Sequence, residues 1–321
     1  MEINKNELRI YSMVGERKTF GMAVDKFASE MDKLFVMSGD LKSSSGLDNF
    51  TKNFPDKYLS PGIAEQNMVG IASGLSTEGY VPFITSFTPF ITGRCYDQIR
   101  MNLGEMHHNV KLIGLAAGVG VGMQGNSHFG LDDVALMRAI PGMTIITPAD
   151  GLEVFKAVEA IYKYNGPVYL RLIGEGNTPI INEDDYEFEI GKAITLREGD
   201  DIALIASGTM VHVMLKVAEK FAEKGVSCKV INMHSLKPLD AEAVKKCMNC
   251  KLIVTAEEAN VIGGLSSAVA EVLSQEGNAP KQVMFGIQDC FPKAGSYQKM
   301  MEDLGLTPDA IYNSIKEKLN R

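Results

Sequence analysis

One carboxylate stands apart in this sequence. Glu65 is the only charged residue between Lys57 and Glu78, and the residues around it, which follow a break at Pro61 and Gly62, are small or apolar and predict a helix. Because burying an unpaired charge is costly, such a carboxylate is expected to bind a ligand or to share a proton. The alternative is that Glu65 only stabilises the first helical turn, where the helix dipole favours a negative charge.

A glycine-rich loop ends close to a histidine. Gly120, Gly122 and Gly125 match the G-x-G-x-x-G pattern of dinucleotide-binding proteins. The residues NSHFG, however, separate this match from the helix expected near Leu131, so a loop that brings a ligand close to the backbone fits better. His128 lies in that intervening stretch, where it is either a structural or a catalytic side chain.

Two arginines and two phenylalanines are further candidates. Arg17 opens a predicted helix and Arg171 ends the strand PVYLR, positions at which a basic side chain either contacts an anion or is simply solvated. Phe87 and Phe90 are three residues apart, a spacing that suits either the core or stacking against a planar ring.

The cysteines do not indicate a metal centre. Cys247 and Cys250 form a C-x-x-C pair, but no second pair of ligands lies near them in the sequence, so a zinc site is not expected. We therefore expect no metal ligand from this chain. An odd and scattered set of cysteines is typical of reduced thiols in a cytosolic enzyme.

Composition narrows the class of protein. The 321 residues are 45% hydrophobic and carry a net charge of −8, which allows a full core and argues against nucleic acid as the main partner. Residues 1–9 lack the apolar centre of a signal peptide, and the longest uncharged apolar stretch, 112–123, is too short to span a bilayer. We expect a cytoplasmic protein.

Short apolar runs alternate with amphipathic windows along the chain, a pattern that predicts an α/β fold. The expected organisation is a domain over residues 1–175, a polar linker over 176–190 and a second domain over 191–321, each with a mostly parallel sheet flanked by helices. The predicted strands are 34–37, 81–85, 110–115, 144–147, 168–172, 201–208, 228–233 and 251–258. The predicted helices are 18–31, 64–75, 94–102, 131–139, 151–164, 210–224, 241–248 and 265–275.

Several blocks together resemble a known family. The segments GIAEQNMVGIASGL, GRCYDQIR, LMRAIPGMTIITPAD, GPVYLR and INMHSLKPLD are similar, in this order, to the C-terminal half of transketolases and of 1-deoxyxylulose-5-phosphate synthases. The resemblance covers nearly the whole chain. It implies a thiamine-diphosphate-binding fold, made of a pyrimidine-binding domain and a transketolase C-terminal domain, and transfer of a two-carbon glycolaldehyde unit from a ketose to an aldose.

The resemblance also implies roles for particular residues. Glu65 matches the carboxylate that contacts a ring nitrogen of the cofactor's aminopyrimidine and so activates the cofactor. Phe90, with Phe87 beside it, matches the aromatic contact to that ring, and Asp40 resembles the family aspartate near the cofactor. His128 matches the catalytic histidine that bonds substrate hydroxyls and aids proton movement.

The substrate positions are only partly similar to those of the family. Arg17, Ser44 and Arg171 match residues that clamp the substrate phosphate. A family histidine of that clamp is replaced here by Ala116, and an aspartate that contacts a substrate hydroxyl is replaced by Gln124. Because charge-assisted contacts are the strong ones, these changes indicate a non-standard sugar, for which a sulfonated one such as sulfofructose is a candidate.

Half of the family's active site is missing from the sequence. The G-D-G motif with a downstream asparagine, which holds Mg²⁺ and the diphosphate, does not occur. We therefore expect an N-terminal transketolase subunit to supply it, in a heterotetramer with two copies of each chain. Two alternatives remain: the beta subunit of a 2-oxo-acid dehydrogenase, and a non-catalytic binding or regulatory relative of the fold.

Overall fold

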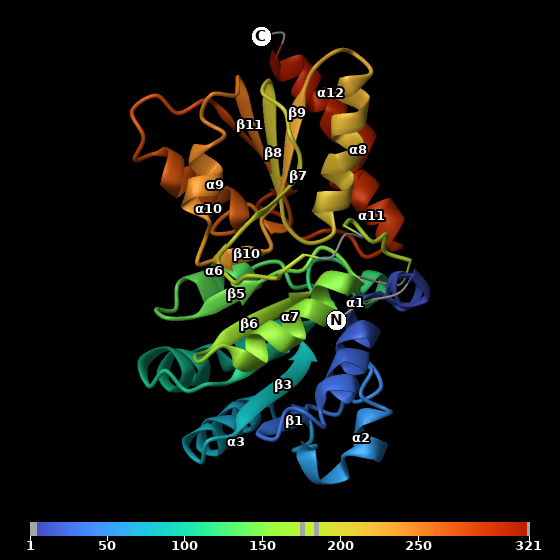
Figure 1. The fold of residues 1–321 in the computed structure, drawn as a ribbon, viewed down its shortest axis with the longest axis vertical. Helices are drawn as coiled ribbons and strands as arrows, with labels where there is room; N and C mark the ends of the chain where they lie inside the picture. Colours follow the sequence, from blue (N-terminus) through green and yellow to red (C-terminus); the bar gives the residue numbers. More distant parts are fainter. Residues whose placement is uncertain (1–4, 174–176, 183–185, 320–321) are drawn as a thin grey trace.

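Two α/β units are stacked along the long axis of the molecule, the N-terminal unit below the C-terminal one in Figure 1. The computed structural model describes residues 5–173, 177–182 and 186–319. The predicted fold class, two domains that each have a mostly parallel sheet flanked by helices, is confirmed.

The lower sheet has seven strands in the order β10-β5-β6-β4-β3-β1-β2, and every neighbouring pair is parallel except β10 with β5. Every residue of β4 and β6 is buried, as expected for parallel strands covered on both faces. The strands are β1 (Leu34–Ser38), β2 (Tyr58–Leu59), β3 (Val81–Phe87), β4 (Lys111–Leu115), β5 (Thr144–Ile146), β6 (Val168–Leu172) and β10 (Ser235–Lys237).

The helices of the lower unit differ from prediction in two places. Instead of beginning near residue 18, α1 spans Lys5–Phe27 with a break at Gly15, whose φ of 75° interrupts the helical backbone. The predicted helix 94–102 is divided into the turn η2 (Gly93–Cys95), α5 (Tyr96–Gln98) and the π-helical η3 (Ile99–Glu105). The other elements are α2 (Phe50–Asn53), η1 (Pro55–Lys57), α3 (Glu65–Thr77), α4 (Thr88–Ile91), η4 (Gly122–Gln124), α6 (Asp133–Arg138) and α7 (Gly151–Lys163).

The upper sheet has five strands in the order β12-β11-β8-β9-β7, with only β7 antiparallel to its neighbour. Residues of β8 alternate between faces: Ile202 and Leu204 pack with α8 and α12, whereas Ala203 and Ile205 pack with α9 and α10. The strands are β7 (Ile194–Arg197), β8 (Ile202–Ala206), β9 (Cys228–Asn232), β11 (Leu252–Asn260) and β12 (Gln282–Ile287). The helices are α8 (Met210–Ala222), α9 (Ala241–Lys245), α10 (Leu265–Leu273), α11 (Tyr297–Asp303) and α12 (Pro308–Leu319).

The two units share a sheet and an apolar core. Strand β10 comes from the C-terminal part of the sequence but extends the lower sheet, and one apolar core contains both Ile145 of β5 and Ile231 of β9. Of the predicted linker 176–190, residues 176 and 183–185 lie outside the described residues. Thr178, within the linker, donates a backbone hydrogen bond to Ser12 of α1 at 3.1 Å. We keep 1–175, 176–190 and 191–321 as the proposed division.

Within residues 5–173, 177–182 and 186–319, none of the helices combines the length and the apolar character that crossing a bilayer requires.

Candidate active site

Glu65 is the first residue of α3, and its carboxylate is almost completely buried, with 2% of the residue exposed. One oxygen accepts a hydrogen bond from Ser86 Oγ at 3.0 Å, and the other forms an ion pair with Arg94 Nη1 at 2.9 Å. The charge is therefore paired within the protein, while the predicted ligand contact of Glu65 stays a prediction. Arg94 lies in a different helical segment, and spacing within α3 could not reveal it.

Arg94 contacts both the Glu65 carboxylate and the Phe90 ring. Its guanidinium carbon lies 4.2 Å from the centre of the Phe90 ring, and 44% of its side chain is exposed. The Gln66 side-chain amide donates to the Arg94 backbone carbonyl at 3.2 Å, which holds this segment against the start of α3. Burial raises the pKa of the neighbouring Cys95 thiol to about 12, and the Glu65 charge adds to the rise, so the thiol stays neutral.

Phe87, Phe90 and His128 form an aromatic cluster. Phe87 ends β3 and precedes α4, which carries Phe90, so their rings lie 6.2 Å apart and nearly perpendicular. The His128 ring packs edge-on against both, at 5.6 Å from Phe87 and 5.1 Å from Phe90. Three residues predicted for the site are thus brought together, and Arg94 connects them to Glu65.

The glycine loop that carries His128, residues 118–130, is closed by hydrogen bonds between its two ends. Gly118 and Gly130 exchange backbone hydrogen bonds of 2.8 and 3.0 Å, which close the loop. Gly125 is followed by a turn, and the next helix, α6, begins only at Asp133. Because the loop does not lead directly into a helix, it lacks the context of a dinucleotide fingerprint.

Asp40 lies two residues after the carboxyl end of β1, which approaches Glu65. A side chain at the preceding Gly39 would place its Cβ 3.5 Å from Glu65 Oε1, which shows how closely this strand end approaches the carboxylate. Asp40 is exposed and has a φ of 59°. Burial raises the pKa of the nearby Tyr58, and the negative charge of Asp40 contributes to that rise.

Arg17 and Ser44 also lie close to each other in the fold. Lys18, beside Arg17, donates to the Ser43 carbonyl at 2.7 Å, and a Cβ at Gly46 would lie 3.0 Å from the Arg17 carbonyl oxygen. Arg17 and Ser44 are both half-buried. The start of the second part of α1 and the loop after β1 are therefore packed together, as a shared binding surface requires.

Arg171 is placed differently from the expectation. Only 2% of this side chain is exposed, and it donates to the Asp133 carboxylate at 2.6 Å and to the carbonyls of Gly130 and Glu258 at 3.1 and 2.9 Å. Because the side chain is almost fully buried and its Nε and Nη2 groups donate inside the protein, the geometry does not support a phosphate contact. Arg171 instead fixes the glycine loop to β11.

The two residues that depart from the family pattern, Ala116 and Gln124, lie in different environments. Gln124 is exposed at the end of η4, where its amide is accessible to a ligand. Ala116 is buried with a φ of 53° just after β4, and its methyl group offers no hydrogen bond.

Among the residues that the structure describes, no three His, Cys, Asp or Glu side chains are grouped so that they could hold a metal ion. Cys247 and Cys250 are buried free thiols, and burial raises the pKa of Cys247 to about 12. A neutral buried thiol is a poor nucleophile and a poor ligand.

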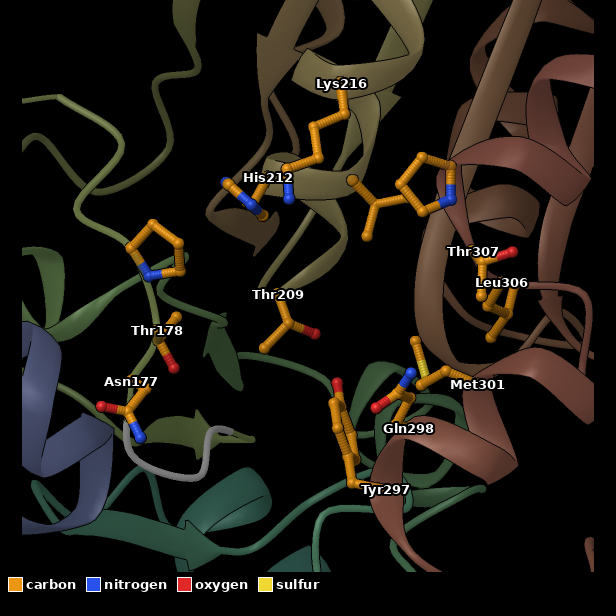
Figure 2. A pocket seen from close by; sticks show the side chains of 13 residues that line it. Asn177, Thr178, Thr209, His212, Lys216, Tyr297, Gln298, Met301, Leu306 and Thr307 are labelled. Atoms are coloured by element: carbon orange, nitrogen blue, oxygen red, sulfur yellow. The ribbon is translucent and has the colours of Figure 1, made fainter.

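A separate cavity of about 420 Å³ lies between the upper unit and residues 177–179 of the predicted linker (Figure 2). His212 and Lys216 of α8 line one side and Tyr297 lies across from them, and burial together with the Lys216 charge lowers the pKa of His212. Tyr297 and Thr209 both donate to Glu258, at 2.6 and 2.7 Å. The cavity is lined by none of the side chains around Glu65.

Known protein families match both units of the chain. Residues 13–175 match the transketolase pyrimidine-binding domain, and residues 191–311 match the transketolase C-terminal domain. These matches agree with the resemblance seen in the sequence.

Individual relatives cover almost the whole chain. The 6-deoxy-6-sulfo-D-fructose transketolase subunit SqwH of a Clostridium species is 37% identical over 95% of this chain and 94% of its own length. An apulose-4-phosphate transketolase subunit of Actinobacillus succinogenes is 35% identical over 90% of this chain and 94% of its own length. A solved split-gene transketolase, described as an inactive β4 tetramer, superposes with a TM-score of 0.86 at 36% identity, covering 96% of this chain and 99% of its own.

Proposed function

This chain belongs to the transketolase family, and we propose that it is the C-terminal subunit of a split transketolase that depends on thiamine diphosphate. The proposed reaction moves a two-carbon glycolaldehyde unit from a ketose to an aldose. The observation that supports it most is the buried carboxylate of Glu65 beside the Phe87, Phe90 and His128 cluster.

The residues present fit an aminopyrimidine ring. Glu65 offers a carboxylate oxygen that, among the described residues, is held by the half-exposed Arg94, while Ser86 retains the other oxygen. The Phe90 ring lies 4.2 Å from the guanidinium carbon of the same Arg94 and provides a surface for stacking. In the proposed complex Glu65 shares a proton with a ring nitrogen, and His128 bonds substrate hydroxyls. Bound thiamine diphosphate would supply the carbon nucleophile.

A partner subunit is part of the proposal. The diphosphate and Mg²⁺ would be held by an N-terminal transketolase subunit, two copies of each chain forming a heterotetramer. The description of a similar solved chain as an inactive β4 tetramer supports this requirement. Helix α3, which begins at Glu65, has open space beside Gly70 and Gly74, and the adjacent Ile63 is 74% exposed, so another chain could approach closely.

The proposed substrate is a non-standard sugar, with 6-deoxy-6-sulfo-D-fructose as the first candidate. Buried Ala116 cannot donate to a terminal phosphate, and the neutral, exposed Gln124 stands where the family has an aspartate. The similarity to SqwH supports the sulfonated sugar, and the similarity to an apulose-4-phosphate transketolase makes that sugar the second compound to test.

The test uses this chain co-purified with an N-terminal transketolase subunit from the same organism. Glycolaldehyde transfer to glyceraldehyde 3-phosphate would be measured with 6-deoxy-6-sulfo-D-fructose and apulose 4-phosphate as donors. Xylulose 5-phosphate would be tested as a donor to ribose 5-phosphate, because its transfer to glyceraldehyde 3-phosphate only regenerates the starting compounds. Glu65→Gln should abolish turnover while leaving the circular dichroism spectrum unchanged. Full activity of that variant would contradict the mechanism, and efficient use of xylulose 5-phosphate alone would contradict the substrate.

A further inference from the structure

We propose that Arg94 occupies the place of the cofactor's pyrimidine ring until the cofactor binds, and that it keeps Glu65 and Phe90 in position for that exchange. This inference rests on the proposed function and assigns a role to a residue outside the predicted site. Two independent contacts support it, one with each residue that would hold the ring.

The first contact is with the carboxylate. Arg94 Nη1 donates to Glu65 Oε2 at 2.9 Å, while Ser86 donates to Oε1. Arg94 therefore takes the oxygen that is not already held within the core. An aminopyrimidine with a proton on its ring nitrogen would make the same kind of N–H···O contact to this oxygen.

The second contact is with the ring. The planar guanidinium lies 4.2 Å from the centre of Phe90, a distance at which planar cations stack on aromatic faces. A flat pyrimidine needs the same aromatic surface. Since one side chain makes both contacts at once, the guanidinium and the pyrimidine compete for the same place.

The two partners of the ion pair differ in how easily each can leave. Arg94 has 44% of its side chain exposed, so its charged end can return to water. Glu65, at 2%, cannot, and without a donor its charge would be buried and unpaired. Gln66 holds only the backbone of Arg94, which leaves the side chain free to swing away.

This arrangement explains how an enzyme subunit can carry a buried carboxylate before its cofactor and partner arrive. Arg94 neutralises Glu65 and covers Phe90 in the free chain. In the assembled enzyme the pyrimidine replaces the guanidinium, so Glu65 Oε2 always has a hydrogen-bond donor, while Ser86 continues to donate to Oε1.

The experiment measures thiamine diphosphate binding to the assembled complex by titration calorimetry in the presence of Mg²⁺. Arg94→Ala removes the competitor. Since an ion pair to a half-exposed arginine and a cation–π contact together contribute enough to change an equilibrium about tenfold, the dissociation constant should fall by about that factor. Arg94→Lys keeps the charge but not the planar stacking, so the dissociation constant should fall by a smaller factor. Because this variant keeps a cation beside Glu65, it still tests the proposal if the alanine variant does not fold.

Arg100→Ala is the matched control. Arg100 follows Arg94 by six residues and forms an exposed ion pair with Asp97 at 2.9 Å. Its removal should leave the dissociation constant of thiamine diphosphate unchanged. In a Glu65→Gln background, where the carboxylate is gone, removal of Arg94 should change the affinity much less than in the wild type.

Each outcome has a distinct meaning. Tighter binding by both Arg94 variants, with Arg100→Ala unchanged, supports the exchange. Unchanged or weaker binding by the Arg94 variants overturns it and leaves the proposed function intact. A wild-type complex that does not bind thiamine diphosphate at all overturns the proposed function, and this inference with it.

Discussion

The carboxylate of Glu258 accepts a hydrogen bond of 3.0 Å from the backbone N–H of Val119, so the upper sheet holds the base of the glycine loop. Glu258 lies on β11, and Val119 directly follows Gly118, where the loop begins. The other oxygen of Glu258 accepts from Thr209 and Tyr297. The position of His128 in the lower unit therefore depends on a side chain of the upper one.

We expect Glu258→Ala to loosen this loop. The substitution leaves the buried Val119 N–H and two partly buried hydroxyl groups without their acceptor, and an unsatisfied buried donor costs about 1–3 kcal/mol, so the free energy of unfolding should fall by about 1–3 kcal/mol. Denaturant titration measures the loss, and hydrogen exchange should show faster exchange at residues 119–129. Glu271→Ala removes an exposed partner of Arg138 and should change neither measurement; equal effects of the two substitutions would contradict the assignment.

His128 should affect catalysis more than stability. His128→Ala removes the ring packed against Phe87 and Phe90 and the group proposed to bond substrate hydroxyls, so kcat/KM should fall by about 100-fold. The rate would be measured with the complex saturated with cofactor. Met123→Ala changes an exposed residue of the same loop and should retain wild-type activity. A His128 variant with unchanged kcat/KM would exclude the proposed role.

Arg171 should behave as a structural residue. Arg171→Met leaves the Asp133 carboxylate buried without a cation, a change that typically costs about 3–5 kcal/mol. Replacing both, as Arg171→Met with Asp133→Leu, should recover much of the loss, because no charge then remains buried. Thermal unfolding of the two variants checks this. If Arg171→Lys raised only the KM for the sugar and left the melting temperature unchanged, the result would contradict a structural role and favour the predicted contact of Arg171 with the substrate phosphate.

Glu257 should make stability depend on pH. Burial raises the pKa of this carboxyl to about 7 from the usual 4.5, while the N–H groups of Leu265 and Ser266 at the start of α10 oppose the rise. Between about pH 4.5 and 7 the folded state therefore holds a proton that the unfolded state has released. This contribution is complete below pH 4.5 and is lost as the pH rises to 7, by about 3 kcal/mol.

The corresponding experiment compares the wild type with Glu257→Gln. Gln cannot titrate, so the difference in unfolding free energy between the two proteins should shift steadily in favour of the variant from pH 4.5 to 7 and stay constant above about pH 8. A difference that does not vary with pH would show that the carboxyl is ionised throughout this range.

Much of the lower sheet follows from local patterns. The apolar runs that become β1, β3, β4 and β6 are largely buried strands, and their bounds lie within two residues of those expected from the sequence. The strands β7, β10 and β12 and the helices α11 and α12 were not predicted. Their segments are short or carry mixed polar residues, and β10 becomes a strand only because β5 of the other unit lies beside it.

The sequence by itself determined the family, the helix that begins at Glu65 and the residue types around it, because these depend on neighbours along the chain. Only the tertiary structure decided which distant groups meet: Arg94 with Glu65, and Arg171 with Asp133 rather than with a ligand. An arginine carries the same charge in either setting. Whether it faces a substrate or a buried carboxylate depends on how strands and loops pack, and spacing along the chain does not contain that information.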